Sequence, residues 1–270
     1  ILEREENPYI EAFWKWFPEA VKHMQVFRIT GGEPLLSKHT NRVIQYLINN
    51  PQPDLEFAIN SNACPPDGIW KNFVNSIKKL EASGSIKSFS LFTSAESVNE
   101  QAEYSRDGMD WDVFNKNIKY FLENTNDINI CFMSAFNIFS LPTIHKYVCH
   151  IEKLKRDYSD RIHMDFAYVR HPEFLDIKIA TKEMIELYLK STITYMRNEK
   201  NKRFKIEEII KLERIYNDCI ARFKKNTNVD ADRFRFVQFV NEYDRRRNKN
   251  FLKTFPEYKE FYKLCENSNV

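Results

Sequence analysis

The sequence predicts an α/β fold: an open parallel β-sheet or partial (β/α) barrel, followed by a helical C-terminal extension. Three observations predict it. Strand-like and helix-like segments alternate at roughly 30-residue spacing through residues 1–170, as in chains of βα units. The strand-like runs are almost continuously apolar, which favours a parallel sheet buried on both faces. After residue 171 the segments have only helical periodicity, so we divide the chain into a core at 1–170 and a basic helical extension at 171–270.

Each element follows from capping residues or from the spacing of apolar residues. Asn7-Pro8 is typical of a helix cap followed by a first-turn proline. The strands are β-branched and aromatic runs, and the helices carry apolar residues three or four positions apart. The predicted strands are 26–30, 55–59, 86–92, 128–136 and 163–169. The predicted helices are 8–23, 40–49, 70–80, 111–122, 144–154, 181–197, 206–223, 233–243 and 256–264. Five strands are too few for an eight-stranded barrel.

Composition excludes several classes of protein. With 43% hydrophobic and 29% charged residues, the chain is expected to fold as a globular protein rather than remain disordered. The uncharged stretch 128–141 is too short and too polar to span a bilayer, so no membrane partner is expected. The five cysteines are separated and form no C-x-x-C pair. We therefore expect a reducing, cytoplasmic location without disulfides or a structural zinc site.

The main candidate for chemistry lies where the strand 26–30 ends. Gly31 and Gly32 allow the backbone to expose its N–H and C=O groups to a ligand. Glu33 follows directly and presents a carboxylate suited to a cationic amine. From these residues alone, a tight βα turn that simply needs glycine explains the pattern equally well.

In its wider context this segment resembles a known family. Arg28-Ile29-Thr30-Gly31-Gly32-Glu33-Pro34-Leu35-Leu36 resembles the second strand of radical S-adenosylmethionine (radical SAM) enzymes. The resemblance implies that Gly31, Gly32 and Glu33 bind the methionyl amino group of S-adenosylmethionine (SAM). The aromatic segment Phe13–Phe17 before it is similar to that of twitch-domain radical SAM proteins.

The resemblance continues in the same order over about residues 7–170. Asn60–Ala63 resembles the third-strand segment of the family, and Ser90 falls where a fourth-strand serine contacts the cofactor. Arg106-Asp107-Gly108 resembles the Arg-x-Gly stretch that opens the fourth helix. Asn137 falls where the family often has a polar residue near the adenine or ribose. The resemblance therefore implies that Ser90, Arg106 and Asn137 also bind the cofactor.

The chain departs from the family in one major respect. Radical SAM enzymes bind a [4Fe–4S] cluster on a C-x-x-x-C-x-x-C loop after the first strand, and no such triplet is present. We expect the chain to be a fragment whose cluster loop lies before Ile1; a relative that has lost the cluster is the other explanation. The intact protein would cleave SAM reductively and abstract a hydrogen atom from an unknown substrate. This chain alone is predicted to be inactive. Ala63 and Phe92 also replace the Gly and Asp usual in the family.

Two other functions remain open. Residues 171–270 carry 22 Lys and Arg against 16 Asp and Glu, so a non-catalytic binding domain on a degenerate barrel could meet an anionic partner through this half. We do not expect nucleic-acid binding, since the basic runs 198–203 and 245–249 lack interleaved aromatics. A conventional phosphate-binding barrel enzyme predicts a late glycine-rich turn, and no glycine follows Gly108. An open sheet edge also predicts self-association.

Overall fold

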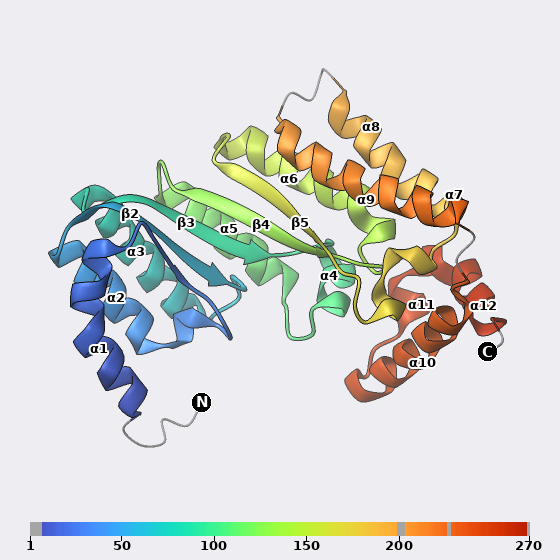
Figure 1. Cartoon of the computed structure of the whole chain (residues 1–270), viewed down its shortest axis with the longest axis horizontal. Helices are drawn as coiled ribbons and strands as arrows, with labels where there is room; N and C mark the ends of the chain where they lie inside the picture. The colour runs from blue at the N-terminus through green and yellow to red at the C-terminus, as the bar shows by residue number, and fades with distance from the viewer. Residues whose placement is uncertain (1–6, 199–202, 226–227, 269–270) are drawn as a thin grey trace. The chain divides into compact units, whose positions relative to one another are not determined.

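The computed structural model describes residues 7–198, 203–225 and 228–268. Within these ranges, a five-stranded sheet has the strand order β1-β2-β3-β4-β5 (Figure 1). β1 pairs in parallel with β2 in a register that places Arg28 opposite Ala58, and β4 pairs in parallel with β5. The strands are β1 (Val26–Ile29), β2 (Gln52–Ser61), β3 (Ile86–Ser94), β4 (Asn129–Phe136) and β5 (Ile162–Tyr168). The predicted α/β class with a parallel sheet is confirmed.

Helices connect each strand to the next. They are α2 (Lys38–Asn49), α3 (Asp67–Ser83), α4 (Asn99–Ser105), α5 (Trp111–Asn124) and α6 (Ile144–Tyr158). Because the strand order follows the chain order and such crossovers are right-handed, the helices belong on one face of the strands. This winding is the one that a partial (β/α) barrel requires. α4 was not predicted, because it is too short to have a clear apolar period.

The two faces of the strands differ in burial. In β4 the residues alternate, so that Phe132 is fully buried while the neighbouring Met133 is only partly buried. β3 alternates in the same way from Ser88 to Ser94. We call the partly buried face, which carries Ser88, Ser90, Phe92 and Ser94 in β3, the inner face. In β3 and β4 one face is therefore only partly buried, contrary to the expectation, whereas Phe57, Ala58 and Ile59 of β2 are buried on both faces.

Residues 7–61, 65–92 and 124–129 form one compact unit. A row of packed aromatic rings runs through this unit. Phe17 of α1 (Pro8–Ala20), Phe27, Phe57 and Phe89 follow one another with ring centroids 5.1, 5.8 and 5.4 Å apart. Each ring comes from a different element, so their packing fixes α1 and three strands together. α1 begins as predicted, with the Asn7 side chain accepting a hydrogen bond from the Tyr9 N–H (3.0 Å).

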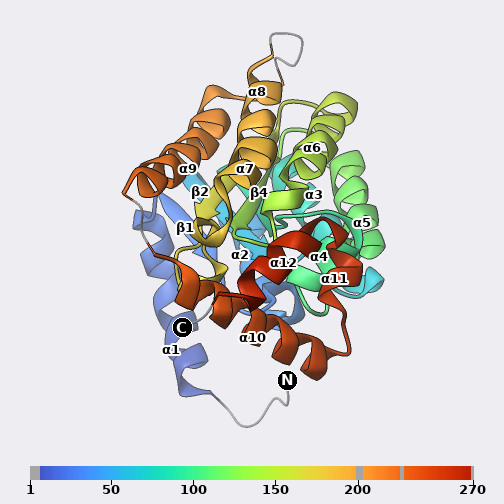
Figure 2. The ribbon, with the colours of Figure 1, turned by 90° about the vertical axis from the view of Figure 1, so that its right-hand side faces the viewer.

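Residues 62–64, 93–123 and 130–268 form a second compact unit, which includes the C-terminal helices (Figure 2). These helices are α7 (Lys182–Met184), η6 (Ile185–Lys190), α8 (Ser191–Arg197), α9 (Ile206–Lys224), α10 (Asp230–Arg247), α11 (Phe251–Thr254) and α12 (Lys259–Glu266). Short 3-10 turns join several of them: η3 (Leu141–Thr143), η4 (Glu173–Leu175), η5 (Ile177–Ile179) and η8 (Pro256–Tyr258). Tyr104 of α4 packs against Phe139, Phe251 and Phe255 at centroid distances of 5.6, 5.8 and 5.3 Å. A shared aromatic core thus joins α4 to the C-terminal helices.

The C-terminal helices match the predicted segments with several differences. The predicted helix 181–197 contains a π-helical segment, η6, and α10 extends beyond the predicted 233–243 at both ends. α11 was not predicted, and the predicted helix 256–264 is divided into η8 and α12. The two compact units do not share bounds with the predicted domains 1–170 and 171–270, and that division stays a prediction. Among the described residues, no helix is both long enough and apolar enough to cross a membrane.

Candidate functional site

The predicted glycine pair forms a turn directly after β1. Gly31 has φ +91° and Gly32 has φ +53°, both in the region that favours glycine. A Cβ atom added to either residue would have no other atom within 4 Å. Conformation therefore favours glycine at both positions, and the space beside the backbone is open.

Glu33 is held at the carboxyl ends of β1 and β2. It caps the short η2 helix (Pro34–Leu36), where its Oε1 accepts a hydrogen bond from the Leu35 N–H (3.2 Å). The same oxygen accepts a hydrogen bond from the Ser61 hydroxyl, 2.9 Å away at the end of β2. These contacts fix a partly buried carboxylate beside the open turn. Ser61 lies in the quoted third-strand segment, but its role as a partner of Glu33 could not be read from the sequence.

Ser90 lies on the inner face of β3, two residues before Phe92, and is partly buried. The Arg28 guanidinium stacks on the Phe92 ring, 3.8 Å from its centroid. The Arg28 Nε donates a hydrogen bond to the Asn60 side-chain oxygen (2.7 Å). The three neighbouring strands of the first unit thus present polar groups on one face, and Ser90 is one of them.

Arg106 belongs to the second unit and is bound to a buried acid. Its guanidinium donates to one carboxylate oxygen of Glu96 from two nitrogens, at 2.7 and 2.8 Å. Only 4% of the Glu96 side chain is exposed. Burial raises the pKa of Glu96, and the charge of Arg106 opposes that shift. No motif in the sequence pointed to Glu96.

The predicted Arg106-Asp107-Gly108 segment borders a hollow of about 390 Å³. Asn62, just after β2, and Ser94, the last residue of β3, also line it. Asp107 forms ion pairs with Arg247 and Lys249, and the hydrogen bond from Lys249 is the main reason that its pKa is lowered. The hollow therefore lies at strand carboxyl ends, where ligands of parallel sheets bind.

Asn137 follows β4, and its side chain forms hydrogen bonds with the neighbouring backbone. Its amide donates to the Ala135 carbonyl (2.8 Å), and its oxygen accepts from the Phe139 N–H (2.8 Å). These bonds stabilise the turn into η3. A ligand contact by Asn137 stays a prediction. Of the six predicted residues, Gly31, Gly32, Glu33 and Ser90 belong to the first unit, and Arg106 and Asn137 to the second.

The residues present fit the methionyl end of SAM better than they fit an iron–sulfur cluster. The open glycine turn and the fixed Glu33 carboxylate suit an ammonium group. The five cysteines all lie in the described ranges and form no disulfide with one another. In the described part of the chain, no group of three or more His, Cys, Asp or Glu side chains is arranged to hold a metal ion. No reaction step is therefore assigned to a cluster.

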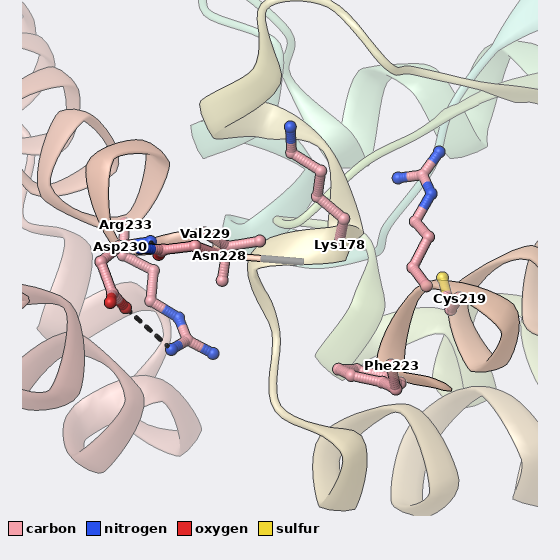
Figure 3. Close-up of a pocket in the computed structure, with 8 residues that line it drawn as sticks. Lys178, Cys219, Phe223, Asn228, Val229, Asp230 and Arg233 are labelled. Atoms are coloured by element: carbon pink, nitrogen blue, oxygen red, sulfur yellow. Dashed lines mark hydrogen bonds and ion pairs between the residues drawn. The ribbon is translucent and has the colours of Figure 1, made fainter. Parts of the chain in front are cut away.

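A second hollow, of about 430 Å³, lies near the start of α10 (Figure 3). Arg233 pairs there with Asp230 at 3.6 Å, while Lys178 and Arg222 pair with carboxylates at 2.8 Å. Burial raises the pKa of the Cys219 thiol to about 12. Because the cations are balanced by acids and the thiol is protonated, this hollow offers neither an anion site nor a nucleophile.

The basic run 245–249 is also largely paired. Arg245 and Arg246 both bind Glu242, and their hydrogen bonds lower the pKa of Glu242 to about 2. Arg247 and Lys249 bind Asp107. Most of the predicted run at 198–203 lies outside the described residues. Comparisons with protein-family models, curated proteins and solved structures found no match for this chain.

Proposed function

We propose that this chain is the SAM-binding core of a radical SAM enzyme. The observation that carries the proposal is the turn after β1, where two glycines with positive φ lie beside a carboxylate fixed by Ser61. Such a turn exposes backbone groups to a ligand at the carboxyl edge of parallel strands, and the carboxylate favours an ammonium group.

In this proposal the predicted residues of the first unit contact different parts of SAM. Glu33 accepts hydrogen bonds from the methionyl ammonium group of SAM, and Gly31 and Gly32 let the ligand approach the backbone. Ser90 offers a hydroxyl on the inner face of β3 for the rest of the cofactor, and contacts of Arg106 and Asn137 with the cofactor stay predictions. The chain binds SAM, and no radical chemistry is proposed for this chain by itself. The substrate is unidentified, and the odd number of cysteines without a C-x-x-C pair favours a reducing, cytoplasmic location.

Calorimetric titration with SAM tests the proposal. The wild-type chain is expected to bind SAM, and Glu33→Gln to weaken binding about tenfold or more, because a charge-assisted hydrogen bond is lost. Gln keeps a carbonyl oxygen for the Leu35 N–H and the Ser61 hydroxyl, so the turn is preserved.

Glu11→Gln is the matched control, because Glu11 is an exposed residue of α1 in the same unit. Its affinity for SAM should equal that of the wild type. A folded wild-type chain that does not bind SAM, or equal binding by wild type and Glu33→Gln, contradicts the proposal. The first of these results would favour the alternative of a non-catalytic binding domain.

A further inference from the structure

One helix face in the second unit brings a thiol and an imidazole together. His145 and Cys149 lie four positions apart on α6, so both side chains project from the same face of this helix. The Cys149 Sγ is 3.7 Å from the His145 Nε2, within hydrogen-bond range for sulfur. His145 is exposed and Cys149 is partly buried, so solvent reaches both residues. Cys149 therefore carries an accessible thiol with a base beside it.

A second helix holds this imidazole in place. α8 packs beside α6 (Figure 2), and the Tyr195 ring of α8 lies edge-on to the His145 ring with centroids 4.8 Å apart. The Tyr195 hydroxyl donates a hydrogen bond to the Glu152 carboxylate, further along α6. This hydrogen bond is the main reason that the pKa of Tyr195 is raised, so the phenol stays protonated. Tyr195 is thus fixed at its hydroxyl end and packs against the imidazole with its ring.

The arrangement matches the general pattern of an activated nucleophile. That pattern consists of a thiol, a base within hydrogen-bond reach, and a third group that orients the base. An imidazole can take the thiol proton, and the imidazolium that results stabilises the thiolate beside it. The thiolate, rather than the thiol, is the reactive form of cysteine. Because the pair lies on an exposed part of α6, a small soluble molecule can reach the sulfur of Cys149.

Other thiols of the same chain have different surroundings. Cys219 and Cys265 are buried, and burial raises the pKa of each thiol to about 12. The Cys64 thiol donates to the Asp110 carbonyl oxygen (3.6 Å), which is too weak a base to take its proton. We therefore expect Cys149 to be more reactive than these three.

We propose that Cys149 is a modification site, which hydrogen peroxide oxidises to a sulfenic acid. His145 takes the proton of the thiol, and the thiolate sulfur attacks one oxygen of the peroxide. An S–O bond forms while the O–O bond breaks, and the leaving hydroxide takes the proton from His145 to form water. The sulfur is oxidised and the peroxide is reduced. This site does not depend on SAM binding, so it goes beyond the proposed function.

The experiment treats the full chain with hydrogen peroxide at neutral pH in the presence of dimedone, which traps sulfenic acids. Peptide mass spectrometry then gives the rate of labelling at each cysteine. Cys149 should be labelled about tenfold faster than Cys64 or Cys131, and Cys219 and Cys265 should stay unlabelled while the chain is folded. In His145→Gln the labelling of Cys149 should slow about tenfold, because an amide cannot take up the proton.

Lys146→Gln is the matched control, because Lys146 is an exposed cation next to His145 on α6. It removes a positive charge but keeps the base, so Cys149 should be labelled as in the wild type. Tyr195→Leu should slow the labelling by releasing the imidazole, and Tyr195→Phe should restore most of the rate because it keeps the ring. Circular dichroism of each variant verifies that it is folded.

Two results would overturn the proposal. One is a folded wild-type chain in which Cys149 is labelled no faster than Cys64. The other is labelling of Cys149 that is equally fast in His145→Gln and the wild type, or that slows as much in Lys146→Gln as in His145→Gln. In the last case the positive charge of the helix face, rather than the imidazole, would set the reactivity of the thiol.

Discussion

His150 on α6 is a residue whose environment was not evident from the sequence. Its ring packs beside Trp111 with centroids 5.1 Å apart, and its Nε2 is buried without a hydrogen-bond partner. Burial, together with the weaker effect of the charges of Lys119 and Lys153, lowers the pKa of His150 from 6.5 to about 4. The folded protein therefore holds this imidazole neutral under conditions where the unfolded chain protonates it.

The free energy of unfolding should consequently fall as the pH decreases from 6.5 to about 4. Between pH 6.5 and about 4, the unfolded state binds a proton that the folded state does not. The free energy of unfolding should be highest above pH 6.5 and decrease by about 3 kcal/mol on acidification to pH 4 because of this group. In His150→Gln, urea unfolding at several pH values should show a smaller decrease.

His145→Gln is the control for this measurement, because His145 lies on the same helix and is exposed. It should keep the pH dependence of the wild type. If His150→Gln also keeps the full dependence, then other groups cause it and the assignment to His150 is wrong.

Among individual residues, the sequence motifs identified candidate site residues but not the side chains that bind to them. The resemblance to radical SAM enzymes pointed to Glu33 and Arg106, but not to Ser61 or Glu96, which bind them. Glu33 and Ser61 are 28 positions apart and meet only because β1 and β2 are adjacent. A pairing between strands requires the sheet register, which local patterns do not contain.

Among the elements, α6, β5 and α9 are joined by a buried ion pair. Lys155 of α6 donates to both oxygens of Glu208 at 2.8 and 2.7 Å, and the two side chains are only 1% and 4% exposed. Glu208 also accepts from the Met164 N–H of β5 (2.7 Å) and from the Lys205 N–H before α9 (2.8 Å). Every oxygen of this carboxylate is therefore used.

Lys155→Met should destabilise the fold strongly. It removes the only cation bound to the Glu208 carboxylate among the described residues, and a buried charge without its partner costs about 3–5 kcal/mol. Chemical denaturation measures this cost. Lys153→Met, two positions away on the exposed side of α6, should change stability by less than about 0.5 kcal/mol. Equal stability of the two variants would show that the pair does not hold these elements together.

Element prediction succeeded where apolar periodicity was long and regular. The strands and the longer helices were found with small shifts of their ends, as in α3 and α9. α4 has only seven residues, and η6 differs from an α-helix in hydrogen bonding rather than in apolar spacing. The different burial of the two strand faces was not predicted. In β3, serines alternate with apolar residues too weakly for the sequence pattern to be distinguished from that of a fully buried strand.

For the molecule as a whole, the resemblance to radical SAM proteins predicts that this chain binds the cofactor but does not carry out the radical chemistry. The chain has five cysteines and no C-x-x-x-C-x-x-C triplet. Reconstitution of the purified chain with iron and sulfide should therefore give well below one [4Fe–4S] cluster per chain, and incubation with SAM and a reductant should give no 5′-deoxyadenosine. Iron analysis and chromatography measure both. One stoichiometric cluster, or formation of 5′-deoxyadenosine, would contradict this prediction.

The Glu208 carboxylate has a consequence for how the molecule opens. It connects backbone groups at Met164 and Lys205 to Lys155, three points brought together only when β5, α6 and α9 have all docked. The Met164 N–H cannot be released by fraying of one helix end, because its acceptor is a side chain from a distant segment. Its hydrogen should therefore exchange with deuterium at a rate governed by cooperative unfolding of this region, far more slowly than the hydrogens at loop positions.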